Sequence, residues 1–183
     1  MIPSSIDQYI EAIESQKNLW NYQEAKKIAQ EALIKNSDDY RLYEEMADIY
    51  LYENDIPHAD EMIQIAQTLH NESATWTYLL GYIAIAKWSY QTGVDYLSRA
   101  NVLFPNNPEI LRNLGWGYVM LGDTSKWVAI LRRALSFSPQ DELIMEDLWV
   151  ALMSNGNMEE GEKYLKQAGR QDRIMELRLL QWL

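Results

Sequence analysis

The feature that most constrains this chain is a repeat with a period of about 34 residues, a length typical of proteins built from repeated units. The segments 77–105 and 111–139 align without insertion or deletion, so that their Leu-Gly pairs, a later Ala and a final Pro coincide. The same step, applied in both directions, predicts five units at residues 6–39, 40–73, 74–107, 108–141 and 142–172. Because a fixed period of this length indicates one structural unit repeated along the chain, it determines the fold of the whole protein.

Within each unit, the recurring apolar positions are spaced as one face of a helix, at i, i+3, i+4 and i+7. Turn-forming residues follow at 53–55, 104–108, 122–125, 138–141 and 155–157. Asp, Asn or Ser in these turns can accept hydrogen bonds from the first N–H groups of the next helix. Ser4, with Asp7 three residues later, predicts a capping box for the first helix. We therefore expect an all-α protein built from pairs of helices.

The pattern resembles the tetratricopeptide repeat, a helix-turn-helix unit of the same length. In residues 108–141 the family's pattern is matched by Leu111, Leu114, Gly115, Tyr118, Gly122, Leu131, Ala134 and Pro139. Gly93 and Trp127 stand where the family has the first Ala of the second helix. The resemblance covers nearly the whole chain. It implies a right-handed α-solenoid of five units plus a C-terminal capping helix at 173–183, forming a single domain over residues 1–183.

Charge is distributed unevenly along the sequence. Residues 1–72 contain fifteen acidic and five basic side chains, whereas residues 73–183 contain twelve and eleven. Such an acidic end repels phosphate backbones and anionic lipid, so we expect no binding to nucleic acid or membranes, and attraction to basic segments. The chain has no Cys, no run of 18 apolar residues and no signal-peptide pattern at its N-terminus. We expect a soluble, cytoplasmic protein.

No group of residues forms a convincing catalytic or metal-binding pattern. His58 and His70 have no second set of ligands near them in sequence, which favours ordinary surface or core positions over metal ligation. Acidic pairs such as Glu44 and Glu45 are interpreted as solvated helix faces or as charges at helix starts. We therefore predict that the protein is not an enzyme and uses neither a cofactor nor a metal.

The resemblance implies that residues between the packing positions of each first helix line a concave groove. The predicted peptide-binding residues are Tyr78, Tyr82, Ile85, Arg112, Asn113, Trp116, Val119, Met120, Val150 and Met153. Trp116 lies between the packing positions Gly115 and Tyr118, so its side chain is predicted to project into the groove. A contiguous apolar patch of this kind is typical of a binding site. The alternative is that the chain itself fills the groove.

These features favour a non-enzymatic adaptor or chaperone that binds an apolar peptide segment. The residues on either side of that segment can be basic. Some members of the family hold acidic C-terminal peptides with a clamp of Lys, Asn and Arg. Here the clamp positions are occupied by Ile10, Glu14, Asp48, Thr75 and Leu79. An acidic partner tail is therefore disfavoured. A self-associating scaffold is the alternative function, and the chain is also similar to the chaperones of bacterial type III secretion translocators.

Residues 174–183 are unusually apolar for the end of a chain. Ile174, Leu177 and Leu180 form one face of a predicted helix, whereas Leu179 and Trp182 lie on another. A helix that is apolar on two sides is expected to be covered on both. We therefore predict that a second copy of the protein, or the groove of the same chain, packs on Leu179 and Trp182. The first case is a homodimer.

Overall fold

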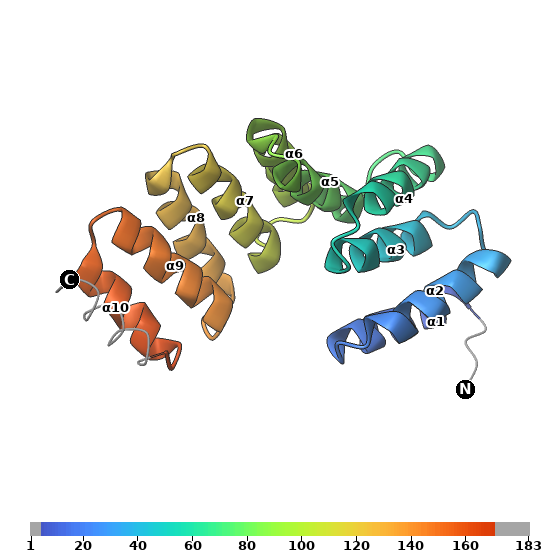
Figure 1. The fold of residues 1–183 in the computed structure, drawn as a ribbon, viewed down its shortest axis with the longest axis horizontal. Coiled ribbons are helices and arrows are strands. Elements are labelled where there is room, and N and C mark those ends of the chain that lie inside the picture. Colours follow the sequence, from blue (N-terminus) through green and yellow to red (C-terminus); the bar gives the residue numbers. More distant parts are fainter. Residues whose placement is uncertain (1–4, 171–183) are drawn as a thin grey trace. The chain divides into compact units, whose positions relative to one another are not determined.

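The computed structural model describes residues 5–170, which are all-α (Figure 1). The predicted capping helix at 173–183 and the predicted dimer-face residues Leu179 and Trp182 lie outside the described residues. Within the described range the helices are α1 (Ile6–Asn18), α2 (Tyr22–Lys35), α3 (Tyr40–Tyr52), α4 (Ile56–Leu69), α5 (Ala74–Ala86), α6 (Tyr90–Leu103), α7 (Pro108–Met120), α8 (Thr124–Phe137), α9 (Glu142–Ser154) and α10 (Met158–Gln167). The prediction of an all-α chain of helix pairs is confirmed over this range.

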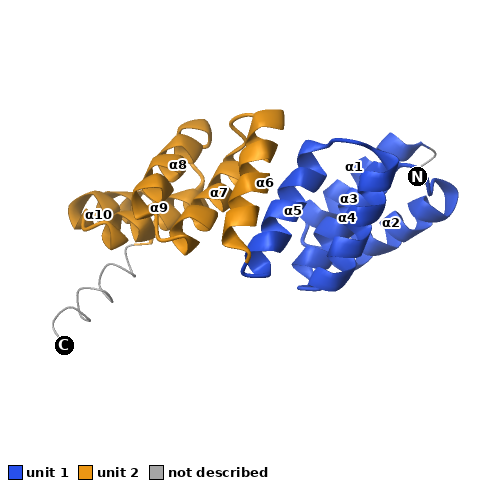
Figure 2. Cartoon of the chain, turned by 90° about the horizontal axis from the view of Figure 1, so that it is seen from above, with its two compact units in different colours: residues 1–88 blue, residues 89–183 orange. Residues whose placement is uncertain are grey.

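The first helix of each pair begins one repeat period after the previous one, at Ile6, Tyr40, Ala74, Pro108 and Glu142. The chain divides into two compact units, which Figure 2 colours separately. Unit 1 comprises residues 1–88 and holds α1 to α5, and unit 2 comprises residues 89–183 and holds α6 to α10. Inside unit 1, α1 packs on α2 and α3 packs on α4; inside unit 2, α7 packs on α8 and α9 packs on α10.

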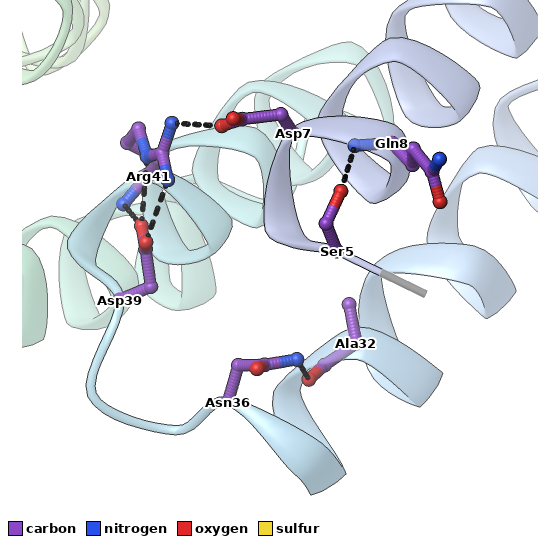
Figure 3. Close-up of polar contacts among 7 residues, drawn as sticks. All are labelled: Ser5, Asp7, Gln8, Ala32, Asn36, Asp39 and Arg41. Carbon is purple, nitrogen blue, oxygen red and sulfur yellow. Dashed lines mark hydrogen bonds and ion pairs between the residues drawn. The ribbon is translucent and has the colours of Figure 1, made fainter. Parts of the chain in front are cut away.

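Side-chain caps begin most of the helices, as the turn residues predicted. Asp123 accepts from the backbone N–H of Lys126 at 3.0 Å, and Asn107, Asp141 and Asp55 cap their helices in the same way. The capping box predicted at Ser4 is wrong. The backbone is still extended at Ser5, whose Oγ accepts from the N–H of Gln8 at 3.3 Å, so Ser5 is the N-cap of α1 (Figure 3).

The turn between the two helices of each pair places one residue in the left-handed backbone region. These residues stand at the same position of each repeat: Trp20 (φ 59°), Asn54 (φ 59°), Trp88 (φ 64°), Gly122 (φ 82°) and Gly156 (φ 82°). Gly and Asn adopt this conformation readily, whereas a bulky side chain costs about 1–2 kcal/mol there. Two of the five turns therefore carry a tryptophan in a conformation that disfavours it.

In unit 1, small residues bring the helices of the first pair close together. Ala25, Ala29 and Ala32 on α2 are fully buried against Tyr9 and Ile13 on α1. Next to this core, Arg41 at the start of α3 donates to Asp7 on α1 at 2.8 Å and to both carboxylate oxygens of Asp39 (Figure 3). Because Asp39 also caps α3, this arginine ties the cap of one repeat to the first helix of the previous repeat.

In unit 2, one tryptophan packs against one glycine in each of the helix pairs α7/α8 and α9/α10. Trp127 on α8 lies against Gly115 on α7, and Trp149 on α9 lies against Gly161 on α10. Trp127 is 2% exposed and belongs to a core with Leu111, Leu131, Leu148 and Leu152. A large residue therefore fits where the family pattern has Ala, since glycine on the partner helix provides the space.

Candidate functional site

The candidate site in unit 2 lies on α7 and α9, which are joined by a polar contact at Asp147. Asp147 on α9 is 8% exposed, and Arg112 on α7 donates to its Oδ2 through Nε at 2.5 Å. Trp116, one helical turn after Arg112, donates to the same oxygen through its indole Nε1 at 3.3 Å. A buried carboxylate without partners is costly, so the two donors explain how it is accommodated.

Trp116 is at once part of this network and partly exposed. Its ring lies 5.7 Å from the ring of Trp127, tilted by 46°, and 39% of the residue remains accessible to solvent. Gly115 and Tyr118, on either side, face the core of unit 2. The side chain is therefore partly accessible to solvent and is held by its contacts with Asp147 and Trp127.

The other predicted residues on α7 and α9 divide into two kinds. Met120 and Val150 are 41% and 38% exposed, which leaves them available to a ligand. Val119 is half-buried against the unit 2 core, and Met153 is half-buried against Trp149 and Leu165. The half-buried Asn113 donates to the carbonyl of Glu109 in its own helix at 3.0 Å. We call the set Arg112, Asn113, Trp116, Val119, Met120, Val150 and Met153 the α7/α9 face.

The remaining predicted residues, Tyr78, Tyr82 and Ile85, lie on α5 and belong to unit 1. Tyr82 is 40% exposed, whereas Tyr78 is half-buried against the core formed by α3, α4 and α5. Ile85 is also half-buried. Only Tyr82 of these three presents a large part of its side chain to solvent.

The interpretation of Glu44 and Glu45 as a solvated face is wrong. Glu44 on α3 is 5% exposed, and its Oε1 accepts from the backbone N–H of Trp76 in the first turn of α5 at 3.2 Å. Burial raises the pKa of Glu44 to about 7. Glu45 accepts from Lys17 on α1 at 2.9 Å. Both carboxylates therefore contact a neighbouring repeat. The spacing of apolar residues within one helix does not predict such contacts.

The sequence did not predict a group of three aromatic residues in unit 1, of which Trp20 and Tyr52 are exposed and Tyr22 is half-buried. Tyr22 and Tyr52 stack with their ring centroids 3.4 Å apart and their planes within 6°. Trp20 lies 6.5 Å from Tyr22 and 6.4 Å from Tyr52, and it is 75% exposed. Leu19, beside it, is 69% exposed. The signal that could have found this group is Trp20 itself, because three of the four equivalent turn residues are Asn54, Gly122 and Gly156, and Trp88 is the fourth.

Neither a cluster of metal ligands nor a membrane-spanning helix is present in the described part of the chain. No three His, Asp or Glu side chains within residues 5–170 gather as metal ligands. Over the same residues, none of the helices combines the length and the apolar character needed to cross a bilayer.

Comparison with known proteins identifies the class of fold. No family model and no curated protein matches the sequence. Among solved structures, MamA is 19% identical with a TM-score of 0.67, over 96% of this chain and 99% of that one. PilF of Pseudomonas aeruginosa is 16% identical with a TM-score of 0.74, over 90% and 75% of the two chains.

The anaphase-promoting complex hetero-tetramer Cut9-Hcn1 is a third similar structure. It is 17% identical with a TM-score of 0.82, over 88% of this chain but only 32% of that one. All three are tetratricopeptide-repeat proteins, so the resemblance seen in the sequence is confirmed at the level of the fold. The chain has the tetratricopeptide-repeat fold.

Proposed function

We propose that this protein is a non-enzymatic adaptor or chaperone that binds an apolar peptide segment of a partner protein on the α7/α9 face. The observation that carries the proposal is the state of Trp116, which is 39% exposed although Asp147 and Trp127 fix its orientation. A large ring that is ordered before binding loses little side-chain entropy when a ligand covers it. Tryptophan is also one of the residue types enriched among those that dominate binding energy.

The chemistry of the face favours an apolar ligand over a charged one. The charged groups at its centre, Arg112 and Asp147, already neutralise each other at 2.5 Å. The accessible side chains beside them are Trp116, Met120 and Val150. Methionine adapts its shape to different partners, which suits a surface that accepts a segment rather than one rigid shape. The tetratricopeptide-repeat fold supports a role in protein interaction, and the absence of Cys supports the cytoplasm as the location.

The test is a selection from a random 12-residue peptide library displayed on phage, followed by affinity measurements with the enriched peptides. The variant Met120→Ser/Val150→Ser removes accessible apolar surface and leaves the contacts of Trp116 in place. The matched control is Val102→Ser/Phe137→Ser, which alters two exposed apolar residues on α6 and α8 of the same unit.

We expect the enriched peptides to be rich in apolar residues. Their affinity is expected to fall at least about tenfold with the first variant, since two contacts of roughly 1 kcal/mol each are lost. The control variant is expected to bind within twofold of the wild-type protein. Peptides that bind both variants equally well, or a library that gives no enrichment, would contradict the proposal.

A further inference from the structure

A second surface, distinct from the α7/α9 face, is formed in unit 1 by exposed side chains together with the half-buried Tyr22. We call it the aromatic edge and define it as Leu19, Trp20, Tyr22 and Tyr52. The two tyrosine rings stack on each other across α2 and α3, and Trp20 leans against both from the turn between α1 and α2. Because the stack orders the rings, the edge is a fixed surface rather than a set of independent side chains.

Trp20 is a bulky residue at a turn position whose backbone conformation disfavours a bulky side chain. Its backbone is in the left-handed region, where the equivalent turns have Asn54, Gly122 and Gly156, which suit this conformation, and one further tryptophan, Trp88. A residue that is 75% exposed gains little from burial to offset this strain. Strain that packing does not explain points to a role in function.

The electrostatic surroundings of the aromatic edge favour a cationic ligand. Leu19 also lines an open depression of about 350 Å³, together with Glu11, Glu14, Ser15 and Asn18. Among residues 5–170, neither Glu11 nor Glu14 takes part in an ion pair. The nearby Lys17 is already bound to Glu45 and Asp48, at 2.9 and 2.5 Å.

Residues 1–72 also carry ten more acidic than basic side chains, so an anionic segment or a second copy of this unit is repelled.

Cation–π contacts already occur at other aromatic rings of this protein. Lys26 lies over the ring of Tyr50 at 4.2 Å, and Lys35 and Lys126 lie over Tyr9 and Tyr118. Within the described residues, no lysine or arginine is placed over Trp20 in this way. Tryptophan is the strongest of the aromatic side chains in this interaction.

We propose that the aromatic edge docks an arginine-bearing segment of a partner protein, with a guanidinium group over the Trp20 ring and a second cation at Glu11 and Glu14. Arginine fits better than lysine because its planar group stacks on aromatic faces and forms paired hydrogen bonds with carboxylates. The site is independent of the α7/α9 face, since all of its residues belong to unit 1.

The experiment follows Trp20 directly by ¹⁹F NMR of the full chain labelled with 5-fluorotryptophan. The resonance of Trp20 is assigned by its disappearance in Trp20→Gly. The probe is a nine-residue peptide of Gly and Ser with three Arg, compared with the same peptide carrying Lys or Glu in place of Arg. The second variant, Trp20→Asn, introduces the residue that the next repeat has at this turn, so both variants are compatible with the backbone.

We expect the arginine peptide to shift the Trp20 resonance and to bind Trp20→Gly and Trp20→Asn about five- to tenfold more weakly than the wild type. Glu11→Gln/Glu14→Gln is expected to weaken binding to a similar degree. The control for net charge is Glu31→Gln/Glu61→Gln, which removes two exposed acids from α2 and α4 and is expected to stay within twofold of wild type.

Three results would overturn the proposal. One is equal binding of the arginine peptide to the wild type and to both Trp20 variants. Another is an equal loss of affinity in the Glu31/Glu61 control, which would mean that only net charge attracts the peptide. The third is a Trp20 resonance that shifts with protein concentration in the absence of peptide, because a second copy of the chain would then be the occupant.

Discussion

Trp127 occupies the space that a side chain on Gly115 would need. A Cβ atom added to Gly115 would lie 3.0 Å from Cδ1 of Trp127. One repeat later the two residue types are exchanged, because Trp149 stands at the position equivalent to Gly115 and Gly161 at the position equivalent to Trp127. A Cβ atom on Gly161 would lie 3.1 Å from Cδ1 of Trp149. The helix pairs α7/α8 and α9/α10 therefore each pack one tryptophan against one glycine, with the large residue on opposite helices.

This arrangement predicts that the effect of Gly115→Ala depends on Trp127. In the wild-type protein the substitution is expected to lower the free energy of unfolding by about 1–2 kcal/mol, because Trp127 is buried and cannot move aside. In a Trp127→Ala background, which itself costs about 3–5 kcal/mol, the same substitution is expected to be neutral or to stabilise by up to about 1 kcal/mol. Urea denaturation followed by circular dichroism measures all four proteins. Equal effects of Gly115→Ala in both backgrounds would contradict the packing described.

The turn residues predict a different effect of adding a methyl group. Gly122 has φ +82°, and a Cβ there would meet no atom within 4 Å. Gly122→Ala is therefore expected to cost about 1 kcal/mol through backbone conformation alone, whatever residue stands at position 127. At the equivalent turn, Trp20→Gly relieves the same strain and loses only exposed ring contacts, so its stability is expected to stay within about 1 kcal/mol of wild type. A loss above about 2 kcal/mol for Trp20→Gly would show that the aromatic edge is structural.

The buried carboxylate of Glu44 predicts a pH dependence of stability. Its pKa is raised to about 7 by burial, so between about pH 4.5 and pH 7 the folded protein holds this proton more tightly than the unfolded chain does. Stability therefore falls as the pH rises through this window. Glu44→Gln keeps an oxygen acceptor for the N–H of Trp76 and removes the charge.

The unfolding free energies of wild type and Glu44→Gln are to be compared from pH 5 to pH 8.5. We expect the variant to be more stable by about 1–3 kcal/mol at pH 8.5 and nearly equal to wild type at pH 5. Burial also raises the pKa of Glu45, and the difference between the two proteins reports on Glu44 together with its charge interaction with Glu45. A difference that is constant with pH would show that Glu44 titrates as an ordinary exposed acid.

The polar network of the α7/α9 face predicts that Asp147 matters more than an exposed acid in a similar ion pair. Asp147→Ala leaves Arg112 and the indole N–H of Trp116 without their acceptor, and we expect a loss of about 1–3 kcal/mol of stability. The control is Glu160→Ala, which breaks the exposed pair with Arg132 at 2.7 Å and is expected to cost under about 1 kcal/mol. Equal losses in a thermal or urea titration would mean that the network does not hold Trp116 in place.

The sequence predicted the elements of the fold because they follow from the period. One apolar face and one capped turn recur in every repeat, so the positions of the helices and their buried faces can be predicted from local pattern. The partial exposure of Trp116 agrees with its place between Gly115 and Tyr118, whereas its projection into a groove stays a prediction. The burial of Glu44 could not be predicted from the period, because its partner is the start of a helix in the next repeat. The period predicts which face of its helix a residue lies on, but it does not predict which residues of the neighbouring repeat pack against that face.

The burial of individual side chains in the candidate site could not be predicted from the period either. Val119 and Met153 have the same helical phase as accessible residues, yet each is half-buried against a core cluster. How far these two side chains are buried depends on the size of the side chains around them, which is a property of packing rather than of periodicity. The aromatic edge was missed for a related reason, since its residues come from a turn and from the ends of two helices.

The most direct test of binding at the α7/α9 face is site-specific photocrosslinking of a selected library peptide. The photoreactive residue p-benzoylphenylalanine is introduced at Val150, and in a separate protein at Val102, which is 75% exposed on α6 of the same unit. We predict that the protein modified at position 150 forms a covalent product with the peptide, that excess unlabelled peptide competes it away, and that the protein modified at position 102 forms little or none. Equal crosslinking at both positions, or a product at position 102 alone, would contradict binding at the α7/α9 face.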